Sequence, residues 1–482
     1  MNRTSMGDGT GDHAGAGDLA GKVRQVLVEE TDEFREAVAR ARARLEEAGV
    51  KYLFGSYVDV HGRSKAKAVP IGSFDRMVRG SELYTVGALE GMGPLGPNED
   101  ECAAVPDLGS LTICPWDRRY AWMASDLWWH GEHYPYDSRW ILEQVLDQAR
   151  HMGFTLNLGF EPEIYILRED EQGNLHPFHP NDRAECWGYD VESTMDAMPF
   201  LDRMVQHLDE LGWGVFSFDH EGGNSQYEFD FGYADALTSA DRYTFMRLML
   251  KEVAKQFGAF ATFMPKPLSD NFGSGAHYNM SLADRDTGRN RFDDPDDLRG
   301  MGYSELAYHF AGGLLKHAGA ITAVTCPTVN SYKRLIGVGY MPMITWAPVY
   351  VRYGDNNRSC MLRFPGNRRC IENRACDIAG NIYLGAAMSL AAGLEGIKEG
   401  IDPGDPTPGN LYELKRDDLA ERGVEQLPRT LLEAIKAFEV DPLSDQVFGP
   451  LKKAYLELKY QEWEQYHNVV SDWERKKYLH FF

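Results

Sequence analysis

The chain has 482 residues, of which 43% are hydrophobic and 26% are charged, as expected for a soluble globular protein with at least two domains. Its formal net charge of −23 would repel a phosphate backbone, so we expect no nucleic-acid partner, although a local basic pocket for a nucleotide stays possible. No apolar run reaches the roughly 18 residues that span a bilayer, and no signal-peptide pattern opens the chain. With seven scattered cysteines and no CxxC pair, we expect a cytoplasmic protein with reduced thiols and no membrane association.

The N-terminal third of the chain predicts a tail and a small domain. Residues 1–21 are rich in glycine and aspartate and predict a flexible tail. Apolar residues at helical spacing predict a helix over 21–48, which Gly49 can end. Strand candidates follow at 51–60 and 64–70. We therefore predict a first domain over 22–135, made of a small sheet and a packed helix.

The remainder, 136–482, alternates helices and strands without a simple βαβ repeat, which predicts one large α+β domain. Helices are predicted over 138–152, 190–211, 239–257, 427–438 and 450–466, and strands over 154–160 and 359–364. The first of these helices has a capping candidate in Asp137 or Ser138.

The first chemically informative motif is Gly-Phe-Glu-Pro-Glu-Ile-Tyr-Ile-Leu at 159–167. Glu161 and Glu163 are two residues apart in an extended, apolar stretch, so both carboxylates face the same side of a strand. Like charges this close repel each other unless cations lie between them. A metal site is one interpretation of this pair, and a solvated strand edge is the other.

A second motif, at 218–230, contains Glu221 and Glu228 on either side of a Gly-Gly-Asn turn signal. A hairpin at this point would bring both carboxylates to one site. Acidic residues beside a turn are common, so this motif alone leaves a metal site and an ordinary turn equally open.

The third motif spans 261–281, where a Gly-Ser-Gly loop at 273–275 precedes an alternating stretch. His277, Asn279 and Ser281 would share one strand face. A single histidine is more often structural than metal-bound. Beside four candidate carboxylates, however, one ring nitrogen of His277 becomes a candidate metal ligand.

Basic residues gather in three stretches, 330–334, 356–363 and 368–374. Their planar guanidinium groups suit phosphates and carboxylates. The candidates are Arg334, Arg358, Arg363, Arg369 and Arg374. Glu372 and Arg374 share a predicted strand face, so a metal ligand and an anion-binding group would be neighbours. A surface cluster of ion pairs is the alternative interpretation.

In this order and spacing, the motifs resemble the glutamine synthetase family from about residue 45 to 482. Other stretches that carry the resemblance are 261–266, 330–335, 410–414 and 471–479. The resemblance implies a small N-terminal β-grasp domain before a large catalytic domain, whose antiparallel sheet is flanked by helices. It also implies homo-oligomeric rings, often dodecamers, with active sites between neighbouring subunits.

The resemblance further implies two or more Mg²⁺ or Mn²⁺ ions in each active site. The ligands of one ion would be Glu163, Glu221 and Glu228, and those of the other Glu161, His277 and Glu372. All six positions carry the expected residue, which argues against a non-catalytic ring protein.

The implied reaction has two steps. The γ-carboxylate of L-glutamate attacks the terminal phosphoryl group of ATP, and an amine then displaces phosphate from the γ-glutamyl phosphate. By motif position, Arg358 is the catalytic arginine that stabilises the transferring phosphoryl group. The implied binding residues are Ser281, Arg358, Arg363 and Arg369 for ATP, and Gly273, Arg334 and Arg374 for glutamate.

Two departures from the family concern the nucleophile. Glutamine synthetases carry a glutamate before Ala-Pro in a flap, where it helps to deprotonate ammonium, but this chain has Trp346 before 347–348. The family's Asp-Gly-Ser-Ser motif, which helps to bind ammonium, is replaced by Val-Gly-Ala-Leu-Glu-Gly at 86–91. The acidic residues at 99–100 are an alternative source of the negative charge that would bind ammonium. We therefore predict that Trp346 lines a pocket for an amine that is larger and more apolar than ammonia.

The patterns at 273–281 and 345–348 are similar to the branch that contains γ-glutamylmethylamide synthetases and type III glutamate–ammonia ligases. We therefore expect a small alkylamine, such as methylamine, as the nucleophile. Ammonia, isopropylamine, aniline and a polyamine remain alternatives.

Three further positions bear on the nucleotide and on regulation. Asn279 and Cys370 stand where many members have a histidine and an arginine near the ATP phosphates, and Arg369 is the candidate to compensate. Tyr412 occupies a position that is adenylylated in some members, and an ordinary surface tyrosine is the alternative interpretation.

Overall fold

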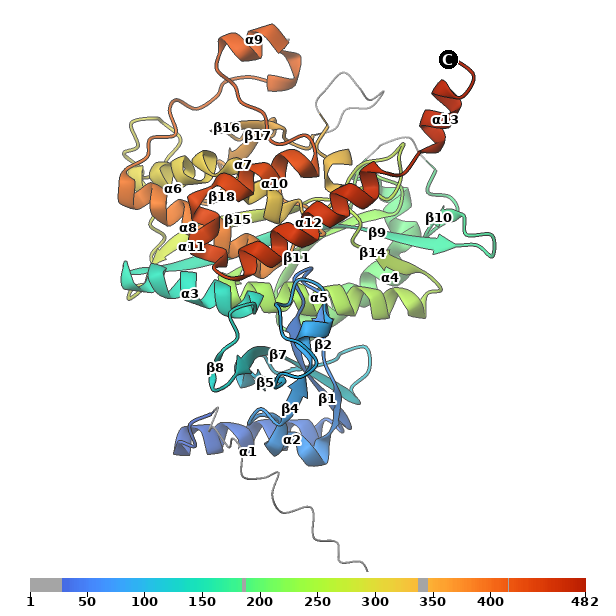
Figure 1. Cartoon of the computed structure of the whole chain (residues 1–482), viewed down its shortest axis with the longest axis vertical. Helices are drawn as coiled ribbons and strands as arrows, with labels where there is room; N and C mark the ends of the chain where they lie inside the picture. Colours follow the sequence, from blue (N-terminus) through green and yellow to red (C-terminus); the bar gives the residue numbers. More distant parts are fainter. Residues whose placement is uncertain (1–27, 184–187, 337–345, 415) are drawn as a thin grey trace, which may run out of the picture.

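The computed structural model describes residues 28–183, 188–336, 346–414 and 416–482. These residues form two sheets with helices packed against them (Figure 1). The predicted α+β fold class is thereby confirmed. The tail expected at 1–21 lies outside the described ranges, as does most of the flap before Trp346.

The first sheet lies in the N-terminal part of the chain. Its strand order is β2 (Ser64–Lys65), β1 (Tyr52–Val58), β7 (Tyr120–Trp129), β5 (Cys102–Pro106) and β4 (Glu82–Tyr84). In addition, β3 (Ala68–Pro70) pairs with β1, and both β6 (Thr112–Ile113) and β8 (Glu132–His133) pair with β7. β1 and β7 are parallel, and the other pairs are antiparallel.

Helix α1 (Asp32–Glu47) covers this sheet (Figure 1). Val38 and Leu45 of α1 are buried in one cluster with residues of β1, β7 and the short helix α2 (Phe74–Met77). The Thr31 side chain accepts a hydrogen bond from the Phe34 amide at 3.0 Å and caps α1, and residues 21–27 of the predicted helix lie outside the described ranges.

The second sheet carries the candidate site. Its strand order is β11 (Val215–His220), β12 (Gln226–Phe231), β9 (Phe154–Glu169), β15 (Ala276–Asp284), β18 (Ile371–Asn373), β17 (Cys360–Phe364) and β16 (Tyr350–Asp355). Three further strands also pair with β9, namely β10 (Leu175–Pro177), β13 (Ala234–Asp235) and β14 (Phe260–Thr262). Only the β16–β17 pair is parallel among these described strands.

Helices surround the second sheet. They are α3 (Ser138–His151), α4 (Val191–Glu210), α5 (Ala236–Gln256), α6 (Glu305–Lys316), α7 (Ala318–Thr325), α8 (Ile382–Glu399), α9 (Arg416–Glu421), α10 (Leu431–Val440), α11 (Pro442–Phe448), α12 (Leu451–His467) and α13 (Asp472–Tyr478). α3 and α5 lie between this sheet and the N-terminal sheet (Figure 1). Asp137 caps α3 as predicted, because its carboxylate accepts a hydrogen bond from the Arg139 amide at 3.0 Å.

The long central strands fix the geometry of the site. β9 pairs with β15 over nine residues, and it pairs with β12 on its other edge. Side chains that alternate along three adjacent strands therefore reach one face of the sheet. Within the described ranges, none of the helices combines the length and apolar character needed to cross a bilayer.

Candidate active site

Acidic side chains from neighbouring strands meet at the C-terminal half of β9. Glu161 and Glu163 share one face of β9, as the sequence predicted, and Glu228 of β12 lies directly opposite Glu163. Glu221 follows β11, which forms a hairpin with β12. All four residues line a cavity of about 370 Å³, which we call the carboxylate cavity.

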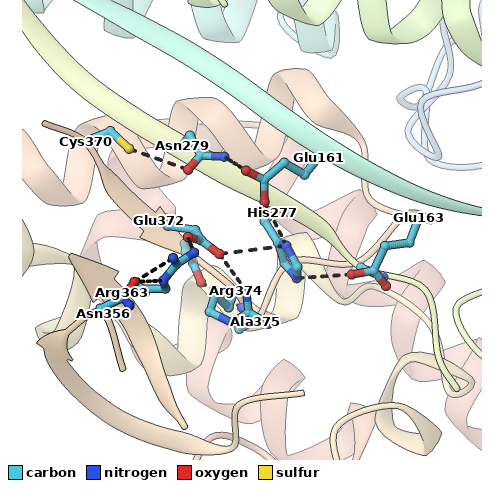
Figure 2. Close-up of polar contacts among 12 residues, drawn as sticks. Glu161, Glu163, His277, Asn279, Asn356, Arg363, Cys370, Glu372, Arg374 and Ala375 are labelled. Atoms are coloured by element: carbon cyan, nitrogen blue, oxygen red, sulfur yellow. Dashed lines mark hydrogen bonds and ion pairs between the residues drawn. The ribbon is translucent and has the colours of Figure 1, made fainter. Parts of the chain in front are cut away.

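His277 stands at the centre of these carboxylates (Figure 2). Its Nδ1 atom lies 3.3 Å from an oxygen of Glu161 and 3.9 Å from Glu372, and its Nε2 atom lies 3.4 Å from Glu163. Two sets of ligand atoms lie within 4.8 Å of one another, Glu161–His277–Glu372 and Glu163–Glu228–His277. The first set coincides with one predicted metal site, and the second contains two of the three residues of the other.

The pKa shifts of these carboxyl groups indicate which kind of ligand the cluster can bind. Burial and repulsion from Glu163 raise the pKa of Glu221 to about 8, and burial together with Glu221 raises the pKa of Glu228 well above its ordinary value. Burial disfavours the charged form of Glu161, but the hydrogen bond and charge of His277, together with the charges of Arg368 and Arg374, outweigh burial and lower the pKa of Glu161 to about 2. This donor set of oxygens and an imidazole, rich in negative charge, fits divalent cations such as Mg²⁺ or Mn²⁺.

Two arginines are tied to Glu372, which is fully buried. Arg363 and Arg374 place Nη1 atoms 2.7 Å and 2.6 Å from its two oxygens (Figure 2). Burial disfavours the charged Glu372 carboxylate, but the charges of Arg374, His277 and Arg363 together outweigh it, so the pKa of Glu372 is lowered. Glu372 of β18 and Arg374, which directly follows that strand, are therefore neighbours, as the sequence predicted.

Arg334 and Arg358 differ sharply in their surroundings. Arg334 is buried and donates hydrogen bonds to the carbonyl oxygens of Arg374 and Ala375 at 3.0 Å and 2.9 Å. Arg358 lines the carboxylate cavity, and no described carboxylate pairs with it. Burial and the neighbouring charge of Arg363 lower the pKa of Arg358, and its guanidinium group forms no ion pair with a described residue.

Gly273 is required by close packing. A Cβ atom at this position would lie 2.6 Å from Cγ of Arg334, so a larger residue would displace that arginine. Two residues later, the Gly275 amide donates a hydrogen bond to Glu163 at 2.6 Å. The loop at 273–275 therefore shapes the cavity wall through its backbone.

Sequence reasoning missed Arg368, which enters the site. Its Nη2 atom lies 2.7 Å from Glu161 and 3.0 Å from the side-chain oxygen of Asn279. Arg369, which was predicted to bind ATP, instead pairs with Asp293 at 3.1 Å and does not line the carboxylate cavity. Period-two alternation from Glu372 back through Cys370 would have pointed to Arg368.

Other cavity residues were also missed. Tyr189, Asp219 and Asp230 line the carboxylate cavity. The Oδ1 atom of Asp219 is buried and has no hydrogen-bond partner within the described part of the chain. The register of the β11–β12 hairpin places Asp219 opposite Glu228, a relationship that sequence alone could not fix. Ser281 is buried on β15 but does not line this cavity.

Trp346 separates the carboxylate cavity from a second cavity of about 670 Å³ and lines both. Within the described part of the chain, its side chain is 57% exposed. Arg358 and Tyr412 also line the second cavity. Tyr412 is partly buried and hydrogen-bonded to the Ala347 carbonyl, which favours a structural role over that of an exposed modification site.

Comparisons with known proteins agree with this geometry. The glutamine synthetase catalytic-domain model matches residues 135–478. A glutamate–methylamine ligase from Methyloversatilis universalis is 42% identical over 445 residues, which are 92% of this chain and 99% of the relative. A glutamine synthetase from Rhizobium meliloti is 34% identical, with coverage of 90% of this chain and 97% of the relative.

Solved structures give the same result. "GmaS/ADP complex-Conformation 1" has a TM-score of 0.85 and 34% identity, and "Apo GmaS without ligand" has a TM-score of 0.81 and 33% identity. Each comparison covers 91% of this chain and 99% of the other. The chain therefore belongs to the glutamine synthetase family. It is an ATP-dependent ligase that joins an amine to glutamate, as the sequence predicted.

Proposed function

We propose that the enzyme joins methylamine, or a similarly small alkylamine, to the γ-carboxyl of L-glutamate, with ADP and phosphate as the other products. The observation that carries this proposal is the position of Trp346 on the wall of the carboxylate cavity, where glutamine synthetases have a glutamate. The 42% identity to a glutamate–methylamine ligase supports it. An indole cannot accept the proton of an ammonium ion, but it provides an apolar surface for a methyl group.

The six predicted metal ligands fit two divalent ions, Mg²⁺ or Mn²⁺. Glu161, His277 and Glu372 would hold one ion. Glu163 and Glu228 would hold the other, with Glu221 completing the set from the opposite strand. Such ions neutralise charge on the phosphates and polarise the transferred phosphoryl group.

The arginines of the site have different proposed roles in phosphoryl transfer and substrate binding. The γ-carboxylate oxygen of glutamate attacks the terminal phosphorus of ATP, the bond to the bridging oxygen breaks, and ADP leaves. Arg358 forms no ion pair with a described carboxylate, so it is the candidate to stabilise the transferring phosphoryl group. Arg334 and Arg374 would bind the carboxylates of glutamate, and Arg363 would bind the nucleotide phosphates, and all three line the carboxylate cavity.

The amine completes the reaction. Its nitrogen attacks the carbonyl carbon of γ-glutamyl phosphate, phosphate leaves with the C–O bond electrons, and the nitrogen loses a proton. Asp219 and Glu221 offer carboxylate oxygens in the same cavity as Trp346, so they are candidates to accept the N–H groups of the amine. A site of this kind combines acceptors for nitrogen with an apolar wall for carbon.

The assembly and location of the enzyme are also proposals. We propose a homo-oligomeric ring, a dodecamer, with active sites between subunits, because the resemblance to glutamine synthetases implies such rings and extends over 90% of the chain. We propose a cytoplasmic location, since the six described cysteines are buried free thiols.

The proposal is tested by steady-state kinetics of phosphate release with ATP, Mg²⁺ and glutamate. The amines compared are ammonia, methylamine, ethylamine, isopropylamine and aniline, each expressed as free amine at one pH. We expect kcat/KM for methylamine to exceed that for ammonia by at least ~100-fold, about 2.7 kcal/mol of discrimination. A preference for ammonia would instead identify a glutamine synthetase, the second candidate, which the 34% identity to such enzymes favours.

A further inference from the structure

The loop between β11 and β12, residues 221–225, carries the predicted metal ligand Glu221. Asp182, from the segment between β10 and α4, lies against this loop and is only 1% exposed. Glu221 lines the carboxylate cavity, whereas Asp182 does not. Any role of Asp182 in the reaction would therefore be exerted through the residues that it contacts.

The Asp182 carboxylate bridges the two ends of the loop. Its Oδ2 atom lies 3.1 Å from Nε2 of His220, which directly precedes Glu221. The same oxygen accepts hydrogen bonds from the Ser225 amide and, at 3.1 Å, from the Ser225 hydroxyl. The Oδ1 atom accepts a hydrogen bond from Nδ2 of Asn224 at 3.0 Å. One buried carboxylate thus joins the residue before Glu221 to the last residues of the loop.

Ser225 has an unfavourable backbone conformation. Its φ angle is +59°, in the left-handed region that residues other than glycine rarely adopt. The Ser225 hydroxyl accepts a hydrogen bond from the Phe178 amide at 2.7 Å, and the Ser225 carbonyl accepts one from the Ile166 amide at 2.9 Å. With the two bonds to Asp182, these contacts hold the strained turn in place. The shape of the loop is therefore imposed by its surroundings.

The loop is also joined to the segment 271–275, which contains Gly273 of the proposed glutamate site. Asn271 donates a hydrogen bond to the side-chain oxygen of Asn224 at 2.9 Å. The side chain of Gln226 donates one to the Gly273 carbonyl at 3.1 Å. Because Asn224 contacts both Asn271 and Asp182, a change at Asp182 would alter how the loop packs against the cavity wall.

We propose that Asp182 is a positioning residue for the metal ion that Glu163, Glu221 and Glu228 would bind. By joining both ends of the loop, it holds the Glu221 carboxylate in the cavity and reduces the ordering that ion binding requires. The inference rests on the proposed function, because it takes Glu221 to be a metal ligand. Asp182 itself contacts neither the ion nor a substrate.

The test is calorimetric titration of the full-length protein with Mn²⁺ at one pH. Asp182→Asn keeps the size of the side chain but leaves one oxygen to accept from donors that now share two. We expect the Mn²⁺ dissociation constant of one class of site to rise at least ~10-fold, since groups that orient a metal ligand have effects of this size. Glu221→Gln identifies the class that depends on Glu221. Weakening of a different class by Asp182→Asn would overturn the proposal.

Asp170→Asn is the matched control. Asp170 also accepts hydrogen bonds from a histidine, an asparagine side chain and a backbone amide, but it does so in the turn after β9 and does not line the carboxylate cavity. We expect this variant to bind Mn²⁺ as the unmodified protein does. If Glu221→Gln weakened a site and Asp182→Asn did not, the role of Asp182 alone would be rejected. If Glu221→Gln itself left Mn²⁺ binding unchanged, the metal assignment of Glu221 would be rejected with it.

The dependence of activity on Mn²⁺ separates positioning from a general loss of structure. We expect Asp182→Asn to need at least ~10-fold more Mn²⁺ for half-maximal phosphate release and to approach the unmodified kcat at saturating Mn²⁺. A lower kcat at every concentration, with an unchanged half-maximal concentration, would overturn the proposal. If Asp182→Asn did not fold, Asn224→Ala at a half-buried position would replace it. We expect a ~3-fold rise in the same dissociation constant, and unchanged binding would overturn the proposal.

Discussion

The phenol of Tyr412 donates a hydrogen bond to the carbonyl oxygen of Ala347, with 2.8 Å between the two oxygens. Ala347 directly follows Trp346. On the other side, the amide of Leu411 donates to the Ser359 hydroxyl at 3.1 Å, next to Arg358. The segment 410–412 therefore supports both the aromatic residue of the proposed amine pocket and the arginine proposed to stabilise the phosphoryl group.

We predict that Tyr412→Phe raises KM for the amine by about 3- to 10-fold and leaves KM for ATP unchanged. The variant removes one hydrogen bond, worth about 0.5–1.5 kcal/mol, and frees the backbone beside Trp346. The measurement is steady-state kinetics with each substrate varied in turn. Tyr350→Phe is the control, because its ring lies 5.9 Å from that of Tyr412 and carries no described hydroxyl contact. An equal effect of both changes would indicate loss of packing alone.

Much of this site was predictable because strand alternation is a local rule. The shared face of Glu161 and Glu163 follows from their spacing alone. The arrangement of β12, β9, β15 and β18 side by side was not predictable from spacing, since strand order depends on packing of the whole sheet. The contribution of Asp219 depends on the register of the β11–β12 hairpin, so only the folded chain shows it, whereas alternation back from Glu372 could have indicated Arg368.

The selectivity for an amine should depend on Trp346. We predict that Trp346→Glu lowers the ratio of kcat/KM for methylamine to that for ammonia by at least ~10-fold, since a carboxylate favours the small, strongly hydrated ammonium ion and removes the apolar wall. The control is Trp473→Glu on α13, an exposed tryptophan far along the chain from the site. An unchanged ratio in Trp346→Glu would mean that another residue selects the amine.

Substitution of a ligand that belongs to one metal site should abolish binding of that ion and leave the other site intact. We predict that Glu372→Gln removes one class of Mn²⁺ site in a calorimetric titration and lowers kcat by at least ~100-fold, because Glu372 belongs to only one of the two ligand sets. Glu399→Gln, at the exposed end of α8, is the control. Retention of the full number of Mn²⁺ ions by Glu372→Gln would contradict the assignment.

Arg368 and its neighbour Arg369 give a paired test of the prediction that Arg369 binds ATP. Arg368→Gln removes the contact with Glu161, so we predict a loss of at least ~10-fold in kcat/KM for ATP. Arg369→Gln removes only the partly exposed ion pair with Asp293, and we expect a change below ~3-fold. The measurement is steady-state kinetics of both variants with ATP varied at saturating glutamate. A larger effect of Arg369→Gln would favour Arg369 as the ATP-binding residue.

A buried histidine between α6 and α7 should make stability depend on pH. His317 lies 2.8 Å from Asp441 and 3.0 Å from Glu395, and Lys316 also pairs with Glu395. Burial disfavours the charged imidazole, but the bonds to Asp441 and Glu395 outweigh it and raise the pKa of His317. Because the folded pKa exceeds the unfolded value of about 6.5, this contribution is complete below pH 6.5 and is lost as the pH rises through the folded pKa.

We therefore predict that His317→Gln lowers the free energy of unfolding by about 1.5–3 kcal/mol at pH 6 and by less at pH 9. The measurement is urea unfolding at fixed protein concentration across this pH range. His151→Gln serves as the control, because His151 is 79% exposed at the end of α3 and should leave the pH profile unchanged. If His317→Gln shifted the stability equally at pH 6 and pH 9, the imidazole would be acting through packing, since the loss of a charged group must vanish once that group is neutral in the unmodified protein.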